Sequence, residues 1–473
     1  MISAGLKYST RSYSVDESRY VVNPKNQMVF EVSELVMDVI RLVQKNGQLD
    51  TVIAEVAEKH AMNPDEATML VWDAVHVLRD AGMLELSLTP IASRPLRDTE
   101  KKLSVGRALL SITHRCNFRC RHCLQGTDSP FNELDTMAWS RIIRNLSDEG
   151  LSHIFVTGGE PLLRADAANI VTEAADYQFP VRLFTNGLLV NSDLVNQLKK
   201  IDSLVVQVSL HGIDSRGFDP FVGVDGAFDR VIDSIRLLTS SGIRVSVATS
   251  FRDELVPKMD HFPTLLQELG VTEWIPTMIM PLGCAYDGWK GLRMSNENLR
   301  EFMDSLFRYL SMYKGNDDFT ISSPFDISML QSTSDDWGFS DLSFGCSLYR
   351  QYINVQPDGT VTPCDRLTNY VLGSLRDTPL SELLSKKDLM QCHIQDVQSR
   401  LDSIGARKRC NECNYRHLCG RGCPGILFHG RNLGEQYDDP VVCRMFNECF
   451  DIVMKYASPQ SGRKLLSMTK KMD

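Results

Sequence analysis

The stretch Arg107–Cys123, RALLSITHRCNFRCRHC, decides how the middle of this chain folds, because a strand-like run leads directly into three closely spaced cysteines. The run RALLSITH is typical of a strand. Cys116, Cys120 and Cys123 follow it with C-x3-C-x2-C spacing. Three thiolates on one loop match the ligands of an iron–sulfur cluster and can reach three corners of a four-iron cube, which leaves the fourth iron open. A zinc site or an accidental group of thiols is the alternative interpretation.

The alternation of strands and helices continues through residues 105–335. Further strand-like runs are HIFVTGG, VRLFTNG, SLVVQVSLHG and IRVSVATSF, and amphipathic stretches such as DRVIDSIRLLTSSG lie between them. This alternation predicts an α/β unit with a parallel sheet, either open or rolled into a barrel. Chemistry gathers at the carboxyl ends of such strands, and Cys116, Gly158, Thr185 and Ser209 lie at or just after those ends.

Residues 1–87 are predicted to form a small α+β unit of their own. RYVVNPKNQMVFEV is typical of a hairpin that turns at residues 23–26. NPDEATMLVWDAVHVLRDAG carries helix end signals, with Asn63 as the cap, Pro64 at the first position and Gly82 as the stop. Two helical stretches before this helix and the short strand MLEL after it complete the pattern of a winged helix.

The segments that flank these two units differ in composition. Residues 88–104 are polar and contain prolines, so we expect a linker there. Residues 336–455 are rich in turn signals and cysteines and are expected to be a loop-rich domain, and residues 456–473 form a basic tail.

Composition indicates a soluble globular protein in a reducing compartment. The 473 residues are 43% hydrophobic and 23% charged, and the net charge of −9 argues against general binding of polyanions. No run of 18 apolar residues and no secretory signal is present, so we expect a cytoplasmic protein without a membrane partner. Thirteen cysteines in such a chain favour metal binding or catalysis over disulfides.

Seven of the later cysteines fall into two regular groups. Cys346 and Cys364 flank a turn at Asp358 and Gly359, which lets one hairpin present both thiols. The second group is Cys410, Cys413, Cys419, Cys423 and Cys443. Taken alone, this second group fits a structural zinc site as well as an iron–sulfur site. Cys449 lies on an amphipathic stretch and is expected to be a buried structural thiol.

The group of Cys116, Cys120 and Cys123 resembles the cysteine motif of the radical S-adenosylmethionine (radical SAM) enzymes. In that family a C-x3-C-x2-C loop follows the first strand of a partial (β/α)6 barrel. The resemblance implies a [4Fe–4S] cluster on Cys116, Cys120 and Cys123, with S-adenosylmethionine bound to the open iron. It also implies cleavage of that cofactor to a 5′-deoxyadenosyl radical, which removes hydrogen from unactivated C–H bonds. Three arginines in the loop add positive charge that suits an anionic cluster.

Other segments resemble the cofactor site of that family. GGEP resembles the segment that binds the methionine amino group, with the glutamate supplying charge for the ammonium; its residues are Gly158, Gly159, Glu160 and Pro161. By itself such a tetrapeptide is also an ordinary strand-to-helix turn. FTNG, which contains Thr185 and Asn186, and VSLHG, which contains Ser209, match later strand ends, and Ser209 is the implied ribose or carboxylate contact.

Two positions depart from the family pattern. His211 stands where relatives often have an aspartate, and Val222 stands where many have an arginine for the methionine carboxylate. Arg216 or another basic residue is the candidate substitute. Cys284, near the expected end of a late strand, is either a small packed residue or a catalytic hydrogen-atom donor, as in radical peptide epimerases.

The later cysteines resemble the SPASM extension of these enzymes, which binds two auxiliary [4Fe–4S] clusters and brings the implied total to three. The outer cluster is assigned by resemblance to Cys410, Cys413, Cys419 and Cys443, and the inner cluster to Cys346, Cys364 and Cys423. The fourth ligand of the inner cluster is then either Cys392 or absent. An open iron there would bind a substrate cysteine, water or a small molecule.

The first unit resembles a recognition element for ribosomally synthesised and post-translationally modified peptides (RiPPs), similar to PqqD. Such modules hold the leader of a precursor peptide, commonly as an added strand. DNA is a poor fit for this winged helix, because residues 1–85 hold 8 Lys and Arg against 13 Asp and Glu, a net charge of −5. A purely structural cap is the alternative.

The resemblance implies a maturase that abstracts hydrogen from a precursor peptide and installs a carbon–carbon or thioether crosslink. Its implied partners are that peptide and an electron donor such as flavodoxin or ferredoxin, with no nucleic acid. The alternatives are formylglycine formation on a sulfatase, radical epimerisation of a peptide and, outside enzymes, an iron–sulfur redox-sensing winged-helix regulator.

Overall fold

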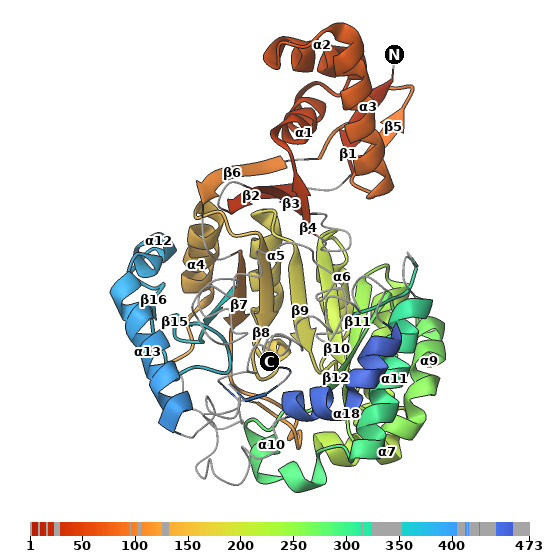
Figure 1. Cartoon of the computed structure of the whole chain (residues 1–473), viewed down its shortest axis with the longest axis vertical. Coiled ribbons are helices and arrows are strands. Elements are labelled where there is room, and N and C mark those ends of the chain that lie inside the picture. Colours follow the sequence, from red (N-terminus) through yellow and green to blue (C-terminus); the bar gives the residue numbers. More distant parts are fainter. Residues whose placement is uncertain are drawn as a thin grey trace.

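The computed structural model describes most of the chain (Figure 1). The described residues are 2–7, 10–15, 18–22, 29–94, 96–102, 106–124, 132–313, 316, 318–322, 352–403, 412–413, 415, 425 and 441–456. Of the segments discussed above, the hairpin turn at residues 23–26, the basic tail from residue 457 onward, and Cys346, Cys410, Cys419 and Cys423 lie outside these ranges. Within the described ranges, no helix is both long and apolar enough to cross a membrane.

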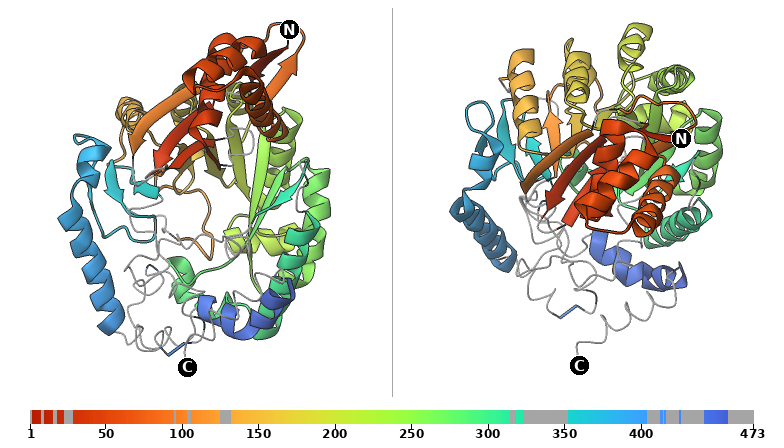
Figure 2. Two further views of the ribbon diagram at one scale, coloured as in Figure 1. Left: turned by 45° about the horizontal axis from the view of Figure 1, so that its top comes forward. Right: turned by 90° about the horizontal axis from the view of Figure 1, so that it is seen from above.

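A parallel sheet with helices outside it forms the middle of the chain, as the alternating pattern predicts. Its consecutive parallel strands are β7 (Arg107–Ser111), β8 (His153–Thr157), β9 (Val181–Thr185), β10 (Leu204–Ser209), β11 (Arg244–Phe251) and β12 (Glu273–Met278). The helices that alternate with them are α4 (Thr136–Asp148), α5 (Ala167–Asp176), α6 (Ser192–Leu198), α7 (Ser215–Val222), α8 (Ala227–Ser240) and α9 (Phe262–Glu268). Figure 2 shows the helices ringed outside the curved sheet, which is a partial (β/α)6 barrel.

The core lies between this sheet and its helices. Strand residues such as Val156, Val206 and Val247 are fully buried, and so are helix residues such as Trp139 and Ile235. Each of these side chains belongs to one continuous apolar cluster, so the strand ends are held by a rigid frame.

The sheet continues beyond the barrel at both ends. After α11 (Asn296–Met312), β13 (Thr320–Ile321) pairs with β12. At the other end, β14 (Tyr352–Val355) pairs in parallel with β7, and β15 (Thr360–Thr362) and β16 (Gly373–Ser374) follow in antiparallel order. The hydroxyl of Ser111 donates to Oδ1 of Asn354 across this junction, 3.0 Å away in the core. The segment predicted as a separate loop-rich domain therefore supplies a strand that covers the edge of the barrel.

The remaining described elements pack around this frame. They are the 3-10 helices η1 (Pro161–Leu163), η2 (Val256–His261) and η3 (Trp289–Gly291) and the helices α10 (Cys284–Asp287), α12 (Leu380–Leu384), α13 (Lys387–Ser403) and α18 (Val441–Tyr456). Helix α18 lies along α11, where Arg300 and Asp451 form an ion pair 2.6 Å long. Cys449 on α18 is fully buried, as expected of a structural thiol.

The N-terminal unit contains the predicted helices and hairpin strands. Its elements are β1 (Ser3–Leu6), β2 (Thr10–Val15), β3 (Ser18–Val22), β4 (Val29–Val32), α1 (Glu34–Asn46), α2 (Leu49–Lys59), α3 (Pro64–Asp80) and β5 (Leu84–Ser87). Strands β3 and β4 pair antiparallel on either side of the predicted turn, and β5 pairs with β1. The side chain of Asn63 caps α3 by accepting the N–H of Glu66 at 2.8 Å, as its end signals predict.

The expected linker is wrong in part, because residues 96–102 form strand β6 (Leu96–Lys102). This strand pairs in parallel with β2 and completes a four-stranded sheet in the order β4-β3-β2-β6. A polar, proline-bearing sequence is a weak strand former, but the main chain of β2 offers it a partner that no local pattern reveals. Figure 1 places this sheet between the helices of the N-terminal unit and the barrel.

Candidate active site

The loop of residues 112–124, here called the cluster loop, is fixed to its neighbours by main-chain hydrogen bonds. The N–H groups of Arg119 and Arg121 donate to the carbonyl oxygens of Val222 and Phe221 at the end of α7, at 2.8 and 3.0 Å. The N–H of Cys284 donates to the carbonyl oxygen of Cys123 at 2.8 Å. These hydrogen bonds connect the loop to the end of α7 and to the segment that begins at Cys284.

The three cysteines of the cluster loop fit a multi-iron cluster. Cys116, Cys120 and Cys123 are all half-buried. Burial, and then the charges of neighbouring groups that include the other cysteines, raise the pKa of Cys116 and Cys120. A metal centre that binds thiolates supplies the positive charge that these crowded sulfurs lack.

The number of thiolates bears on the choice between a zinc ion and a cluster. A structural zinc ion takes four ligands in a closed tetrahedral site. A four-iron cube takes one thiolate at each iron, so three cysteines of one loop can hold it and leave one iron open.

The glycines of GGEP allow a close approach to the cluster loop. A Cβ atom at Gly158 would lie 2.3 Å from the carbonyl oxygen of Thr113, and one at Gly159 would lie 2.4 Å from that of Arg115. The N–H groups of Gly159 and Glu160 donate to these same two oxygens, both at 2.8 Å. Only residues without a Cβ can form this junction.

Glu160 joins the ends of β8 and β9. Its fully buried carboxyl group accepts hydrogen bonds from the Thr185 hydroxyl at 2.8 Å, the Asn186 N–H at 2.7 Å and the Leu162 N–H at 3.0 Å. Burial raises the pKa of Glu160 to about 7, although these hydrogen bonds oppose the shift. Both carboxyl oxygens thus accept hydrogen bonds from the protein, and Glu160 is a positioning residue that connects the two strand ends. Its contact with the ammonium of the cofactor stays a prediction.

Asn186, the residue after β9, contacts the cluster loop at Cys116 and Asn117. Its Nδ2 donates to Oδ1 of Asn117 at 2.7 Å and lies 3.9 Å from Sγ of Cys116. Its Oδ1 accepts the N–H of Leu188 at 3.0 Å, which fixes the orientation of the amide. The FTNG segment therefore positions the first cysteine of the loop.

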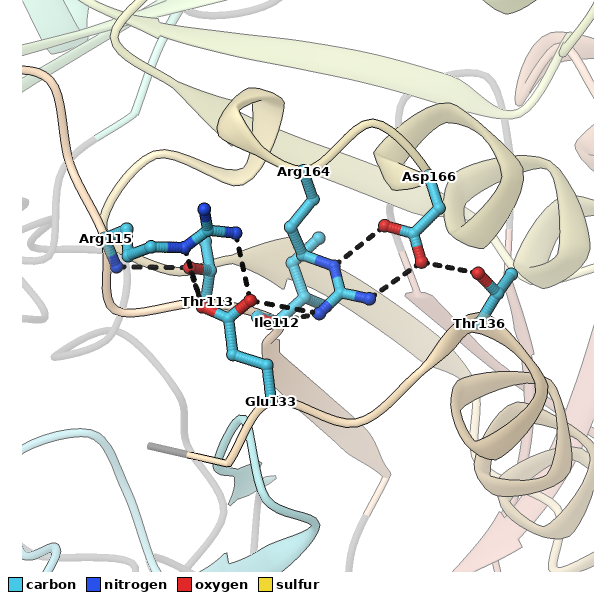
Figure 3. A network of polar contacts seen from close by, with 7 residues as sticks. All are labelled: Ile112, Thr113, Arg115, Glu133, Thr136, Arg164 and Asp166. Atoms are coloured by element: carbon cyan, nitrogen blue, oxygen red, sulfur yellow. Dashed lines mark hydrogen bonds and ion pairs between the residues drawn. The ribbon is translucent and has the colours of Figure 1, made fainter. Parts of the chain in front are cut away.

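A second brace, which the sequence did not indicate, holds the start of the cluster loop (Figure 3). The carboxylate of Glu133 accepts from Nε and Nη2 of Arg115, at 3.1 and 3.0 Å, and from the hydroxyl of Thr113. Arg164, just after GGEP, lies 3.4 Å from the same carboxylate and forms a two-point ion pair with Asp166, at 2.9 and 2.7 Å. Burial by itself would raise the pKa of Glu133. The hydrogen bonds from Arg115 and Thr113 outweigh this effect and lower the pKa.

A buried group of rings supports the other side of the loop. The His122 ring lies 4.8 Å from that of Phe221 and 4.5 Å from that of His211, measured between centroids. The guanidinium of Arg252 lies 4.0 Å above Phe221 and donates to the carbonyl oxygens of His211 and Gly217, at 3.0 and 2.7 Å. Burial lowers the pKa of His122 to about 4 and also lowers the pKa of His211, so both rings are neutral at pH 7.

The remaining predicted site residues differ in placement. Ser209 is the half-buried last residue of β10. Arg216 is exposed on α7, whereas Arg252, a base that the sequence analysis did not single out, is only 5% exposed. The sequence carried no spacing signal for Arg252 beyond its position just after β11.

Cys284 lies beside the cluster loop. With Cys120 and Cys123 it lines a cavity of about 310 Å³. A Cβ atom at the preceding Gly283 would lie 2.3 Å from the carbonyl oxygens of Cys123 and Leu124, so this segment too packs directly on the loop. Cys284 is exposed, so its placement gives no support to the interpretation of a small packed residue, and its role as a hydrogen-atom donor stays a prediction.

The later cysteines, from Cys346 onward, are described only in part. Cys364 is buried just after the β14–β15 hairpin, whose turn contains Gly359 at φ +87°, as predicted. The ring of Tyr415, two residues after Cys413, lies 5.9 Å from that of Phe446 on α18, the helix that carries Cys443. Cys392 is exposed on α13, so its placement gives no support to a role as the fourth ligand.

Comparisons with known proteins match both cysteine regions. The Radical SAM superfamily model matches residues 110–254, and the iron-sulfur cluster-binding domain model, SPASM, matches residues 346–414. The AdoMet-dependent heme synthase of Nitratidesulfovibrio vulgaris is 25% identical over 338 residues, which cover 69% of this chain and 89% of that protein. Mycofactocin maturase MftC of Mycobacterium tuberculosis is 26% identical over 324 residues, which cover 67% of this chain and 78% of MftC.

A solved structure shares the fold over most of the chain. SuiB of Streptococcus suis, bound to S-adenosylmethionine, superposes with a TM-score of 0.62 at 15% identity, covering 91% of this chain and 98% of SuiB. The Radical SAM match runs from β7 to just after β11 and so contains the cluster loop, GGEP, FTNG and VSLHG. The chain is therefore a radical SAM enzyme with a SPASM domain, and its cofactors are S-adenosylmethionine and iron–sulfur clusters.

Proposed function

We propose that this enzyme modifies a ribosomally synthesised precursor peptide and installs a carbon–carbon or thioether crosslink in it. The observation that carries the proposal is the combination of the cysteine-bearing barrel with an N-terminal unit whose described sheet ends at strand β4. MftC is a maturase, and SuiB has also been solved bound to its precursor peptide SuiA. The heme synthase and MftC matches cover nearly equal shares of this chain, 69% and 67%.

The N-terminal unit is the proposed binding site for the leader of that peptide. In the described sheet, β3 pairs with one side of β4, and β4 is an outer strand. An outer strand offers main-chain groups to which an extended peptide can add. A leader held there raises the effective concentration of the core peptide at the active site. Selection of the substrate then does not depend on the reacting residue alone.

The side chains at the strand ends have separable proposed roles. Cys116, Cys120 and Cys123 would hold one [4Fe–4S] cluster, and the SPASM cysteines would hold two more. Bound S-adenosylmethionine supplies a radical that removes hydrogen from the peptide. Gly159 and Glu160 fix the geometry of the loop. Asn186, just after β9, and Ser209, at the end of the neighbouring strand β10, would orient the cofactor.

The proposal is tested with the reconstituted enzyme under anaerobic conditions. We expect incubation with S-adenosylmethionine, a reductant and the precursor peptide to yield 5′-deoxyadenosine and a peptide lighter by two hydrogen atoms. The variant with Cys116, Cys120 and Cys123 all changed to alanine should yield neither product, because it lacks the thiolates for the first cluster. Intact peptide mass, or turnover of a tetrapyrrole in place of the peptide, would contradict the proposal.

Radical epimerisation is a second candidate, and the placement of Cys284 favours it. This exposed thiol lines the same cavity as two cysteines of the cluster loop. A thiol at such a place can return a hydrogen atom to a peptide radical. If it does, Cys284→Ala should abolish a product that has unchanged mass in ordinary water and carries one added deuterium when the reaction runs in heavy water. A crosslinked product made at the normal rate by this variant would assign no catalytic role to Cys284.

A further inference from the structure

A chain of buried hydrogen bonds crosses the junction between the barrel and the SPASM region. The hydroxyl of Ser111, the last residue of β7, donates to Oδ1 of Asn354 on β14 at 3.0 Å. Nδ2 of Asn354 donates to Oγ1 of Thr362 on β15 at 3.3 Å, and the Thr362 hydroxyl donates to the carbonyl oxygen of Cys364 at 3.1 Å. Ser111, Asn354 and Thr362 are all fully buried. The hydrogen bonds therefore run without a break from the strand that precedes the cluster loop to a SPASM cysteine.

The amide of Asn354 gives this chain of hydrogen bonds its direction. A side-chain amide accepts only at its oxygen and donates only at its nitrogen, whereas a hydroxyl group can do both. Because Nδ2 of Asn354 donates to Thr362, the single proton of the Thr362 hydroxyl is left for another acceptor. The carbonyl oxygen of Cys364 lies 3.1 Å away, and that of Asn354 itself lies at a longer 3.5 Å. The amide thus directs the Thr362 hydroxyl toward Cys364.

Cys364 lies where separate segments of the chain meet. It is buried, and its carbonyl oxygen also accepts the N–H of Leu367, at 3.4 Å. A Cβ atom at Gly425 would lie 2.7 Å from Cβ of Arg366, so a later segment packs directly on the chain two residues after Cys364. The hydrogen bond from Thr362 is therefore the shorter of the two to this carbonyl oxygen, and it ties Cys364 to the barrel.

We propose that Asn354 is a positioning residue that, through Thr362, fixes Cys364 for metal binding relative to the cluster loop. The proposal rests on the proposed assignment of an auxiliary cluster to Cys364. Groups that hydrogen-bond around a metal ligand orient that ligand, and their loss weakens metal binding. Ser111 precedes Cys116 by five residues, so the same hydrogen bonds refer both cysteine sites to one strand. The spacing of the two sites then depends on the buried junction and not on a loop.

The test measures how fast iodoacetamide alkylates each cysteine of the full-length protein before cluster reconstitution, resolved by mass mapping of its peptides. The chain carries its own references, because Cys392 is exposed and Cys449 is fully buried on α18. In the parent we expect Cys364 to react much more slowly than Cys392. Asn354→Leu and Thr362→Val should each raise the rate at Cys364 by about 10-fold or more, because each leaves a buried hydrogen-bonding group unpaired and makes local opening easier. The rate at Cys449 should not change.

The matched control is Thr360→Val, the same substitution two residues earlier on β15. The Thr360 hydroxyl forms no hydrogen bond with a described residue, so the rate at Cys364 should equal that of the parent. The double variant Asn354→Leu/Thr362→Val should react no more than about 2-fold faster than either single variant, because both changes interrupt one chain of hydrogen bonds. After reconstitution, both single variants should bind less iron than the parent and the control.

Several results would overturn the proposal. They are a parent in which Cys364 reacts as fast as Cys392, an unchanged rate at Cys364 in Asn354→Leu, and an equal rise at Cys449, which would mean general unfolding. An iron content equal to that of the parent in both single variants would also overturn it. Full iron content in Cys364→Ala would instead count against the assignment of a cluster to this cysteine. A failure to modify the peptide would count against the proposed function, and the alkylation rates depend on neither result.

Discussion

Replacement of Gly159 by alanine is expected to lower the rate of S-adenosylmethionine cleavage by about 100-fold. The added Cβ would lie 2.4 Å from the carbonyl oxygen of Arg115 and 2.7 Å from the carbonyl oxygen of His114. Both are main-chain atoms, so no side-chain rotation can relieve the clash and the cluster loop has to move. A displacement of about 1 Å in the catalytic geometry typically costs about 100-fold in rate.

The measurement is the amount of 5′-deoxyadenosine formed under dithionite, together with the iron content of the protein. Gly217→Ala on α7 is the matched control, because its Cβ would meet only Oδ1 of Asp214, at an ordinary 3.4 Å. We expect this control to retain the parent rate. Full activity in Gly159→Ala would show that the close approach of GGEP to the loop is not required.

Local signals in the sequence predicted the elements that depend on local chemistry. Asn63, Pro64 and Gly82 mark the ends of α3, because caps and left-handed glycines act within one turn of the helix. The run from Val181 to Thr185 forms β9, as predicted. A short strand-like run that is bounded by a glycine turn can be recognised from its own residues. The cysteine spacing likewise indicated its chemistry from a few neighbouring residues.

Pairings between distant segments were not predictable in the same way. β12 was not among the predicted strands, because Pro276 lies inside it and proline cannot donate to a neighbouring strand. Among the described residues, β13 pairs only with Glu273 and Trp274, so Pro276 has no described neighbour on that side to which it would have to donate. The addition of β14 to the edge of β7 depends on a partner more than 200 residues away.

The candidate site shows the same division. Gly158 and Gly159 were singled out because GGEP resembles the family segment that binds the methionine amino group, in which glycine allows a close approach of main chains. Glu133 was not, because its partners Arg115 and Arg164 lie 18 and 31 residues away and an isolated carboxylate carries no motif. Residues that touch a cofactor tend to recur in motifs, whereas residues that brace a loop are found only from the folded structure.

Glu160→Ala is expected to lower the free energy of unfolding by about 3 kcal/mol or more. The carboxyl group of Glu160 satisfies three donors, the N–H groups of Leu162 and Asn186 and the hydroxyl of Thr185. Each buried donor left without an acceptor costs about 1–3 kcal/mol. Urea denaturation of the parent and the variant measures this loss. An exposed carboxylate such as Asp193→Ala, on α6, is the control and should change the value little.

The pH dependence of this stability follows from the same burial. Because burial raises the pKa of Glu160 from 4.5 to about 7, the folded chain holds a proton that the unfolded chain has released between these two values. Stability therefore falls as pH rises through this window, by about 1.4 kcal/mol per unit for this group, and is level above it. The side chain of Glu160→Gln cannot titrate. The free energy of unfolding of the parent should therefore rise, relative to that of the variant, by about 3 kcal/mol from pH 8 to pH 5. Parallel curves for the two proteins would mean that the carboxyl group stays ionised in the folded state, and the three hydrogen bonds would then outweigh its burial.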